Sequence, residues 1–298
     1  MATTLALLPD FLLILLGYAL RRGLHLGDHF WNGMEKLVYF VFFPALLFNA
    51  LARANLDWAT AAPLLFTGLL IMLAGMALGG MARWLFAMSP VSFASQFQCA
   101  FRFNTYIGLA VAAKLHGAPG LAAMGLLTGA MVPPANIAAV GMLARHGGAS
   151  LWSELAKNPL VISTLAGLLW NLSGLVLPLP AAQFLGRLAD AAITLGLLAV
   201  GAALRLDHLP GGGYGSATWF LSVKLLLLPL VAVGLGRWLN LDAMYYDIAL
   251  IFAALPTASS AFILARRMGG DGGSVAWLIS AGTLAAMVTL PLWLAFRR

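Results

Sequence analysis

The sequence predicts an all-α polytopic membrane protein with ten transmembrane helices, arranged as two inverted repeats of five helices each. Hydrophobic residues make up 62% of the 298 residues and charged residues only 9%, a composition that excludes an ordinary soluble domain. The chain also matches itself at an offset of 152 residues, with Asn104 opposite Pro256 and Arg53 opposite Arg205. Because each copy holds an odd number of spans, the second copy must lie upside down in the bilayer, as in secondary transporters.

The ten predicted spans follow from the length of chain needed to cross a membrane. A hydrocarbon core of ~30 Å requires about 20 apolar residues in one helix. The stretches that meet this requirement are residues 3–21, 34–54, 58–86, 91–116, 118–145, 158–177, 180–205, 214–239, 244–268 and 272–296. Short connections rich in Gly, Pro and charged residues separate them. The first repeat is predicted at residues 1–150 and the second at residues 151–298.

The first apolar stretch differs from a cleaved signal peptide in the order of its parts. Arg21 and Arg22 follow the apolar residues instead of preceding them, and no small-residue cleavage site comes after them, so we expect a retained helix. If the N-terminus lies outside, nine Lys and Arg residues fall in cytoplasmic connections and five in outer connections. The positive-inside rule therefore favours both termini outside, although the terminal pair Arg297-Arg298 argues against it.

The charge and cysteine content exclude several other classes of protein. The net charge of +7 is spread over loop ends and forms no basic patch with aromatic neighbours, so no nucleic-acid partner is expected. The single Cys99 excludes an intrachain disulfide, and the glycine-rich connections lack the Lys-Ser/Thr of a phosphate-binding loop. The sequence has no clustered histidines or acids for a metal or a catalytic site. We therefore expect no enzyme and no cofactor.

The candidate binding site lies where the predicted spans 91–116 and 244–268 carry helix-breaking residues at equivalent positions of the repeat. Pro256 removes a backbone hydrogen bond, and the resulting break must face protein or a water-filled cavity instead of lipid. Two such breaks would meet near the middle of the membrane and present N–H groups of half-helices to an anion. The neutral polar residues beside them are Asn104, Thr105, Thr257, Ser259 and Ser260. The alternative is a kinked packing helix whose hydroxyl groups are already hydrogen-bonded.

Charged residues inside the predicted spans are candidates for substrate binding or for coupling. Arg102 could bind a carboxylate through two N–H groups, or it could pair with an acidic neighbour. Asp190 lies three residues after Arg187, a spacing that favours an ion pair, with proton coupling as the alternative. Asp247 could cap an interfacial helix end or act as a gating partner. Lys224 is expected to reach the interface or to pair.

Four stretches in different spans form a set that points to a known family. They are Pro44 with Leu46-Leu47-Phe48, the stretch from Arg102 through Asn104 to Gly108, Asn158-Pro159-Leu160, and the stretch from Ala254 through Pro256 to Ala258. Together they resemble the auxin efflux carrier family of membrane transporters, whose motifs are P-x-L-L-F, R-x-N-x-x-x-G, N-P-L and a break in the ninth span. The resemblance covers essentially the whole chain. One departure is Ala110, where many relatives have proline, and it predicts a looser break in the fourth span.

The resemblance implies a fold shared with sodium/bile-acid symporters, in which broken spans four and nine cross. It also implies a short, bacterial-type member in the cytoplasmic membrane that carries a small organic anion such as malonate or malate by alternating access. Spans one, two, six and seven would form a scaffold among membrane lipids, and this scaffold could hold a homodimer interface. A sodium-coupled organic-anion symporter is one alternative, although no carboxylate ligand is predicted near the crossover. A transporter-like membrane sensor without flux is another.

Overall fold

The computed structural model describes residues 2–24, 26–54, 58–143, 158–205 and 211–296, and every element in these ranges is a helix. The all-α prediction is therefore confirmed. By length and composition, six helices of the described chain are apolar and long enough to cross a membrane, and two shorter apolar helices accompany them. One of the six extends over 54 residues, from Pro90 to Leu143, and contains both a break and a kink. The count of ten spans stays a prediction.

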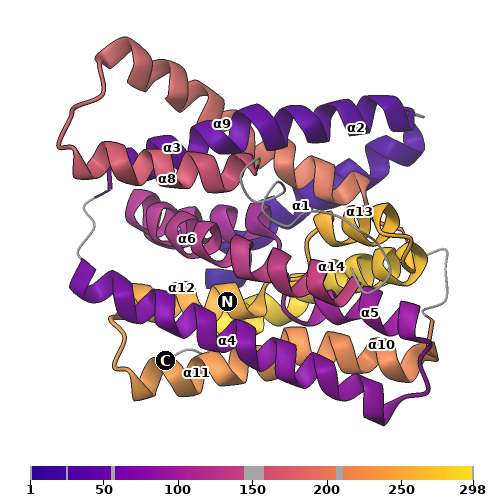
Figure 1. The fold of residues 1–298 in the computed structure, drawn as a ribbon. Helices are drawn as coiled ribbons and strands as arrows, with labels where there is room; N and C mark the ends of the chain where they lie inside the picture. The colour runs from indigo at the N-terminus through magenta and orange to yellow at the C-terminus, as the bar shows by residue number, and fades with distance from the viewer. Residues whose placement is uncertain (1, 25, 55–57, 144–157, 206–210, 297–298) are drawn as a thin grey trace.

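The first part of the chain folds into helices that reach both sides of the molecule (Figure 1). In order they are α1 (Ala2–Gly23), α2 (Asp28–Leu37), the π-helical turn η1 (Val38–Phe42), α3 (Phe43–Ala52), α4 (Trp58–Leu85), α5 (Pro90–Phe97), the 3-10 turn η2 (Gln98–Ala100) and α6 (Thr105–Leu143). The second helical stretch begins at Asp28, earlier than the predicted residue 34. The prediction missed these first turns because they are polar and do not belong to the apolar run. Within α6, Gly117 has a φ of 60°, which marks a kink that glycine permits.

The second part of the chain is also built of long and interrupted helices. It consists of α8 (Pro159–Leu172), α9 (Leu179–Ala202), α10 (Gly213–Ser222), the π-helical turn η4 (Val223–Leu227), α11 (Leu228–Trp238), α12 (Ala243–Ala254), α13 (Ser260–Arg267) and α14 (Gly272–Ala295). α8 ends at Leu172 and not at the predicted residue 177, because Gly174 turns the chain with a φ of 69°. The predicted boundary between the two repeats, near residue 150, lies outside the described residues.

Two groups of helices can be distinguished by their packing (Figure 1). α9 packs against α1, α2 and α3, and α3 packs in turn against α8, whereas α4, α10, α11, α12 and α14 form the other group. α6 contacts members of both groups. The broken stretch α5–α6 therefore contacts α4 and α14 and, through α6, also the α3 group, whereas α12–α13 contacts α4, α6 and α14.

The seam between α1 and α9 depends on two glycines. A Cβ added to Gly17 would overlap the carbonyl oxygen of Leu198, and one added to Gly201 would overlap the carbonyl oxygen of Ile14. The two contacts are reciprocal, since each helix places a glycine against the backbone of the other. Small residues at such seams allow close helix packing where no hydrophobic driving force operates between helices.

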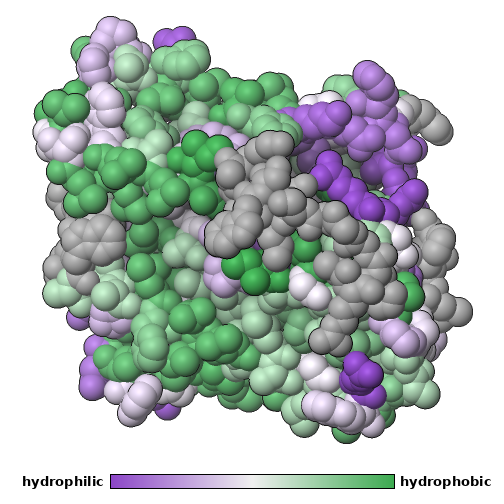
Figure 2. Space-filling model, viewed as in Figure 1, coloured by the Kyte–Doolittle hydropathy of each residue, from purple (hydrophilic) through white to green (hydrophobic). Residues whose placement is uncertain are grey.

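The outer surface is apolar over most of the face shown in Figure 2. Large apolar side chains that would be buried in a soluble protein are exposed here, among them Val176 at 89%, Trp84 at 80% and Trp238 at 69%. A continuous apolar exterior on this scale is typical of a membrane surface. The exterior therefore agrees with the six apolar helices in indicating an integral membrane protein.

Candidate functional site

The two helix breaks meet in the structure. Residues 101–104 lie outside any helix, as do residues 255–259. The backbone N–H of Asn104 donates a hydrogen bond to the carbonyl of Pro256 at 2.8 Å, and the Thr257 hydroxyl donates to the carbonyl of Cys99 at 2.9 Å. Asn104 and Thr257 are both buried. We call this region, residues 98–105 and 254–261, the crossover.

The break after α12 follows from its proline. Pro256 has no N–H group and disfavours a helical conformation in the residue before it. Leu255 accordingly has a φ of −62° and a ψ of 138°, which is extended backbone. The Pro256 carbonyl, freed from the helix, becomes the acceptor for Asn104. The sequence alone therefore accounts for this break.

The break before α6 has a different cause. The Asn104 side-chain oxygen accepts hydrogen bonds from the N–H groups of Tyr106 at 3.1 Å and Ile107 at 3.3 Å, so Asn104 caps α6. Gly108 and Ala110 lie inside α6, not in the break. The cap interrupts the helix without a proline at position 110, and whether this break is looser than the one at Pro256 stays a prediction. A Cβ on Gly108 would lie 2.8 Å from the Leu255 side chain, so this glycine allows the two breaks to approach.

The cap also corrects the expectation of free N–H groups at this half-helix. The N–H groups of Tyr106 and Ile107 are already bonded to Asn104, and Gly108 donates to the Asn104 carbonyl at 3.1 Å. Thr105 is buried as the first residue of α6. The N–H groups of Tyr106, Ile107 and Gly108 are thus all hydrogen-bonded to Asn104 and are not free to bind a ligand. Any anion here must be bound mainly by side chains.

A polar cluster of four residues lies at one face of the crossover, and we call it the crossover cluster: Glu35, Arg102, Ser259 and Ser260. The Arg102 guanidinium donates to the Ser260 hydroxyl at 3.1 Å, which joins one broken stretch to the other. The Ser259 hydroxyl donates to Glu35 at 3.2 Å, which joins the second break to α2. All four residues are partly exposed.

Glu35 is the residue of this cluster that the sequence analysis missed. The sequence predicts no carboxylate near the crossover, and the structure places one there, in contact with Ser259. Tyr39 of the π-helical turn η1 lies near Arg102, and Tyr106 of α6 lies near Glu35. The available signal was an acidic residue near the start of an apolar run, which is a functional candidate in any membrane span.

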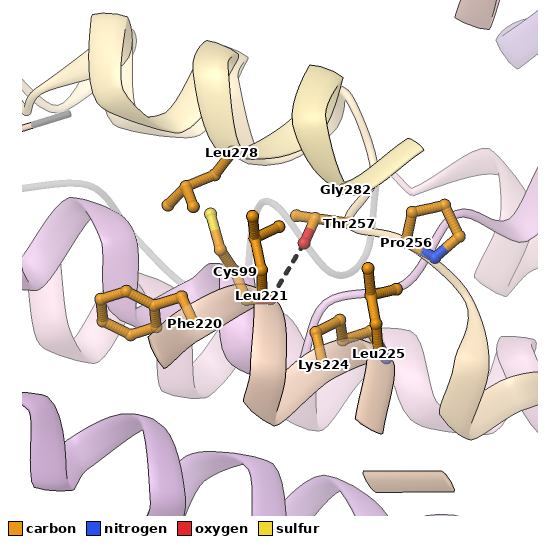
Figure 3. A pocket seen from close by; sticks show the side chains of 9 residues that line it. All are labelled: Cys99, Phe220, Leu221, Lys224, Leu225, Pro256, Thr257, Leu278 and Gly282. Atoms are coloured by element: carbon orange, nitrogen blue, oxygen red, sulfur yellow. Dashed lines mark hydrogen bonds between the residues drawn. The ribbon is translucent and has the colours of Figure 1, made fainter. Parts of the chain in front are cut away.

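Lys224 lies beside a small cavity at the crossover, which no residue of the crossover cluster lines (Figure 3). The buried Lys224 ammonium donates to the Ala253 carbonyl at 3.2 Å, at the C-terminal end of α12, where the helix dipole favours a cation. The prediction that Lys224 reaches the interface is therefore wrong, since its partner is a buried backbone carbonyl. The cavity, which Pro256 and Thr257 also line, has a volume of about 10 Å³, room for about one water molecule.

Two π-helical turns of the described chain lie beside the crossover. η1 supplies Tyr39 next to Arg102, and η4 supplies Lys224 next to the end of α12. Single π-helical turns inside α-helices are rare and frequently mark functional sites. Their position beside the two breaks makes the crossover the leading candidate site in the described chain.

The two carboxylates expected to serve in coupling have different surroundings. Asp190 and Arg187 are both exposed on α9, and no ion pair joins them in the described chain. The expected pairing is therefore wrong, because a spacing of three residues permits an ion pair on an exposed face but does not enforce it. Asp247 lies 2.9 Å from His116 of α6. It is not a helix cap, since α12 begins after Asp242.

Comparison with known proteins gives a consistent result. The family described as "Membrane transport protein" matches residues 113–294, more than half of the chain. An "Uncharacterized transporter" of Methanothermobacter thermautotrophicus is 28% identical, over 98% of each chain. A "Putative malonate transporter" of Rhizobium meliloti is 28% identical over 96% of this chain and 94% of its own length.

A plant protein is similar over a shorter region. A "Probable auxin efflux carrier component 1b" of Oryza sativa is 25% identical over 56% of this chain and 30% of its own length. Together with the relatives that match over nearly their whole length, it agrees with the family resemblance of the sequence. The chain belongs to the membrane transport protein family, which includes the auxin efflux carriers.

Proposed function

We propose that this protein is a secondary transporter that binds a small organic anion at the crossover and moves it across the membrane by alternating access. The observation that carries the proposal is the hydrogen bond from Arg102 to Ser260, because it joins a cation of one broken stretch to a hydroxyl of the other. A carboxylate could replace the hydroxyl as the acceptor and would gain a charge-assisted hydrogen bond. The named malonate transporter among the relatives supports a carboxylate as substrate.

The proposed architecture is ten spans in two inverted repeats, with both termini on the outer side of the cytoplasmic membrane. Its support is the offset of 152 residues, which relates Asn104 to Pro256 and also relates the two breaks. In this arrangement the group formed by α1, α2, α3, α8 and α9 would be the scaffold. The other group would move the crossover relative to this scaffold, and it consists of α4, α10, α11, α12 and α14.

The crossover as described, with its two breaks hydrogen-bonded to each other, would be one state of such a cycle. The cavity beside Lys224 is too small for a dicarboxylate, so the substrate would enter on the face of the crossover cluster. There Arg102 would supply the cationic fork and Ser259 and Ser260 the hydroxyl groups. Asn104, Thr105, Pro256 and Thr257 would hold the two breaks in position around it. Substrate binding would separate Arg102 from Ser260 and so bias the crossover toward movement.

We propose Glu35 as the group that couples proton movement to transport. It is the carboxylate in contact with the crossover, through Ser259. A charged Glu35 would repel an incoming carboxylate, and protonation would remove that repulsion. Asp247, paired with His116, is a second candidate, and Asp190 on the exposed face of α9 is a weaker one.

Proteoliposomes test the proposal. Purified protein is reconstituted and the uptake of radiolabelled malonate is measured with a pH gradient, with a sodium gradient and with neither. We expect uptake that is driven by the pH gradient, competed by other dicarboxylates and lost in Arg102→Gln. Uptake driven only by sodium would support the symporter alternative. Malonate binding in calorimetry without uptake would support a sensor, and neither binding nor uptake of any carboxylate would contradict the proposal.

A further inference from the structure

A second cavity lies at the end of α1, and no residue of the crossover lines it. It has a volume of about 300 Å³ and opens where the C-terminal end of α1 meets the beginning of α2 and the C-terminal end of α9. Its polar walls are Tyr18, Arg21, Arg22, Asp28 and Arg205. Figure 2 shows hydrophilic side chains gathered at the upper right, where Figure 1 places the beginning of α2.

The described walls of this cavity carry a net positive charge. Arg21 donates to the Ala202 carbonyl at 2.8 Å and also pairs with Asp28. Arg205 lies 3.8 Å from the same carboxylate, so one Asp28 serves two guanidinium groups. The Arg22 guanidinium lies over the Tyr18 ring, 4.5 Å from its centre, and no carboxylate of the described chain pairs with it. Three cations against one anion leave an unmet preference for a ligand of negative charge.

The geometry of the donors suits a phosphate. Guanidinium groups present planar sets of N–H donors that match the oxygens of phosphate or carboxylate. Arg21 is held by the carbonyl of Ala202 and Arg22 by the ring of Tyr18, so both are positioned without a ligand. A volume of about 300 Å³ is at the lower end of the range for small-molecule sites.

The surface that leads to the cavity is apolar. Leu8, Leu12, Leu15 and Ala19 are exposed at intervals of three or four residues, and Arg22 continues the same face of α1. From Leu8 to Arg22 this face is roughly 21 Å long, at about 1.5 Å per residue. An acyl chain could therefore lie along α1 while its headgroup occupies the cavity.

We infer that this cavity binds the phosphate headgroup of an anionic phospholipid whose acyl chains lie along α1. Basic pockets between membrane helices are a general means of recognising anionic headgroups. The adjoining apolar face distinguishes a lipid from free phosphate, which would need the arginines alone. The inference is independent of what the crossover transports.

The test measures the unfolding temperature of the purified protein in detergent with added phosphatidylglycerol, phosphatidylcholine, glycerol 3-phosphate or inorganic phosphate. A ligand that binds the native state raises this temperature. We expect a clear rise with phosphatidylglycerol and little change with the other three. Native mass spectrometry of the same samples should show phosphatidylglycerol bound in preference to phosphatidylcholine.

Variants assign the effect to the cavity. The double variant Arg22→Gln with Arg205→Gln keeps the Arg21–Asp28 pair and should lose more than half of the rise. The control, Arg83→Gln with Arg237→Gln, removes the same charge from exposed ends of α4 and α11. It should keep the full rise. If the double variant does not fold, Arg22→Gln alone is informative, because among the described residues the exposed Arg22 is held by the ring of Tyr18 and by no carboxylate.

Three results would overturn the inference. An equal rise with phosphatidylcholine would mean that the headgroup is not recognised. An equal rise with glycerol 3-phosphate or inorganic phosphate would indicate a site for free anions. A full phosphatidylglycerol response in the double variant, or an equal loss in the control pair, would place the lipid elsewhere on the protein.

Discussion

The backbone N–H of Asn104 donates to the carbonyl of Pro256 at 2.8 Å, and the two residues are 152 positions apart, the offset at which the chain matches itself. Equivalent residues of the two halves are thus hydrogen-bonded to each other. Each supplies what the other break needs, since Pro256 frees a carbonyl and Asn104 has an N–H outside its helix. The crossover is therefore one structural unit, and a change in either break should affect the other.

We expect Asn104→Ala to lower both stability and transport. The alanine cannot accept from Tyr106 and Ile107, and loss of a helix cap costs about 1 kcal/mol. Chemical unfolding and malonate uptake would measure the two effects. Asn104→Asp is the matched control, because its side chain can still cap α6. Unchanged stability in Asn104→Ala would show that the cap contributes little.

Arg102→Lys should weaken malonate binding. Lysine keeps the charge but lacks the planar fork of N–H donors that could bind a carboxylate through two hydrogen bonds in place of Ser260. Loss of one charge-assisted hydrogen bond costs about 1.5 kcal/mol, or roughly tenfold in affinity. Calorimetry would measure it, with Arg53→Lys at an exposed position as the control. Equal affinity in wild type and Arg102→Lys would assign Arg102 a structural role.

Glu35→Gln should flatten the pH dependence of uptake while leaving the fold intact. Glutamine can still accept a hydrogen bond from Ser259, but it cannot take up a proton. Uptake measured across a range of pH would show the effect. The comparison variant is Asp247→Asn, which removes the other coupling candidate. If only Asp247→Asn flattens the profile, proton coupling belongs to the pair with His116.

Pro256→Ala should let the chain between α12 and α13 return toward helix. Alanine is about 3 kcal/mol more favourable than proline inside a helix, so the unfolding temperature should stay equal or rise. The same change would withdraw the Pro256 carbonyl from Asn104, so uptake should fall. Pro291→Ala, in the continuous helix α14, should leave uptake intact. A Pro256→Ala protein that melts lower and transports normally would contradict the proposed role of the break.

Gly201→Ala should destabilise the protein by about 1–3 kcal/mol, the usual cost of overpacking. Its Cβ would overlap the Ile14 carbonyl, and a backbone atom cannot move aside as a flexible side chain can. Gly234→Ala in α11 is the control, because nothing lies within 4 Å of its added Cβ. The control should be neutral or stabilising, since alanine favours helix. Equal melting of the two variants would show that α1 and α9 can separate at little cost.

The parts of this structure that could be predicted from sequence are those with a local cause. Long apolar runs predict the membrane helices, and Pro256 predicts the break after α12. The Asn104 cap could also have been expected, because asparagine before the first turn of a helix is a strong capping signal. The contact between Glu35 and Ser259 could not, because it joins residues 224 positions apart, and packing alone decides it. The π-helical turns at Tyr39 and Lys224 likewise leave no recognisable pattern in the apolar runs around them.

The glycine seam between α1 and α9 has a mechanical consequence. The backbones of α1 and α9 are in direct contact at Gly17 and Gly201, so neither helix can slide or rotate against the other without steric overlap. The two helices should therefore move as one rigid body. If the proposed transport cycle moves these helices, the displacement would occur on the other side of α9, where Gly196 makes room for the stacked rings of Phe43 and Tyr106. The stacked rings of Phe43 and Tyr106 would then be the contact at which the crossover slides against the α1–α9 pair.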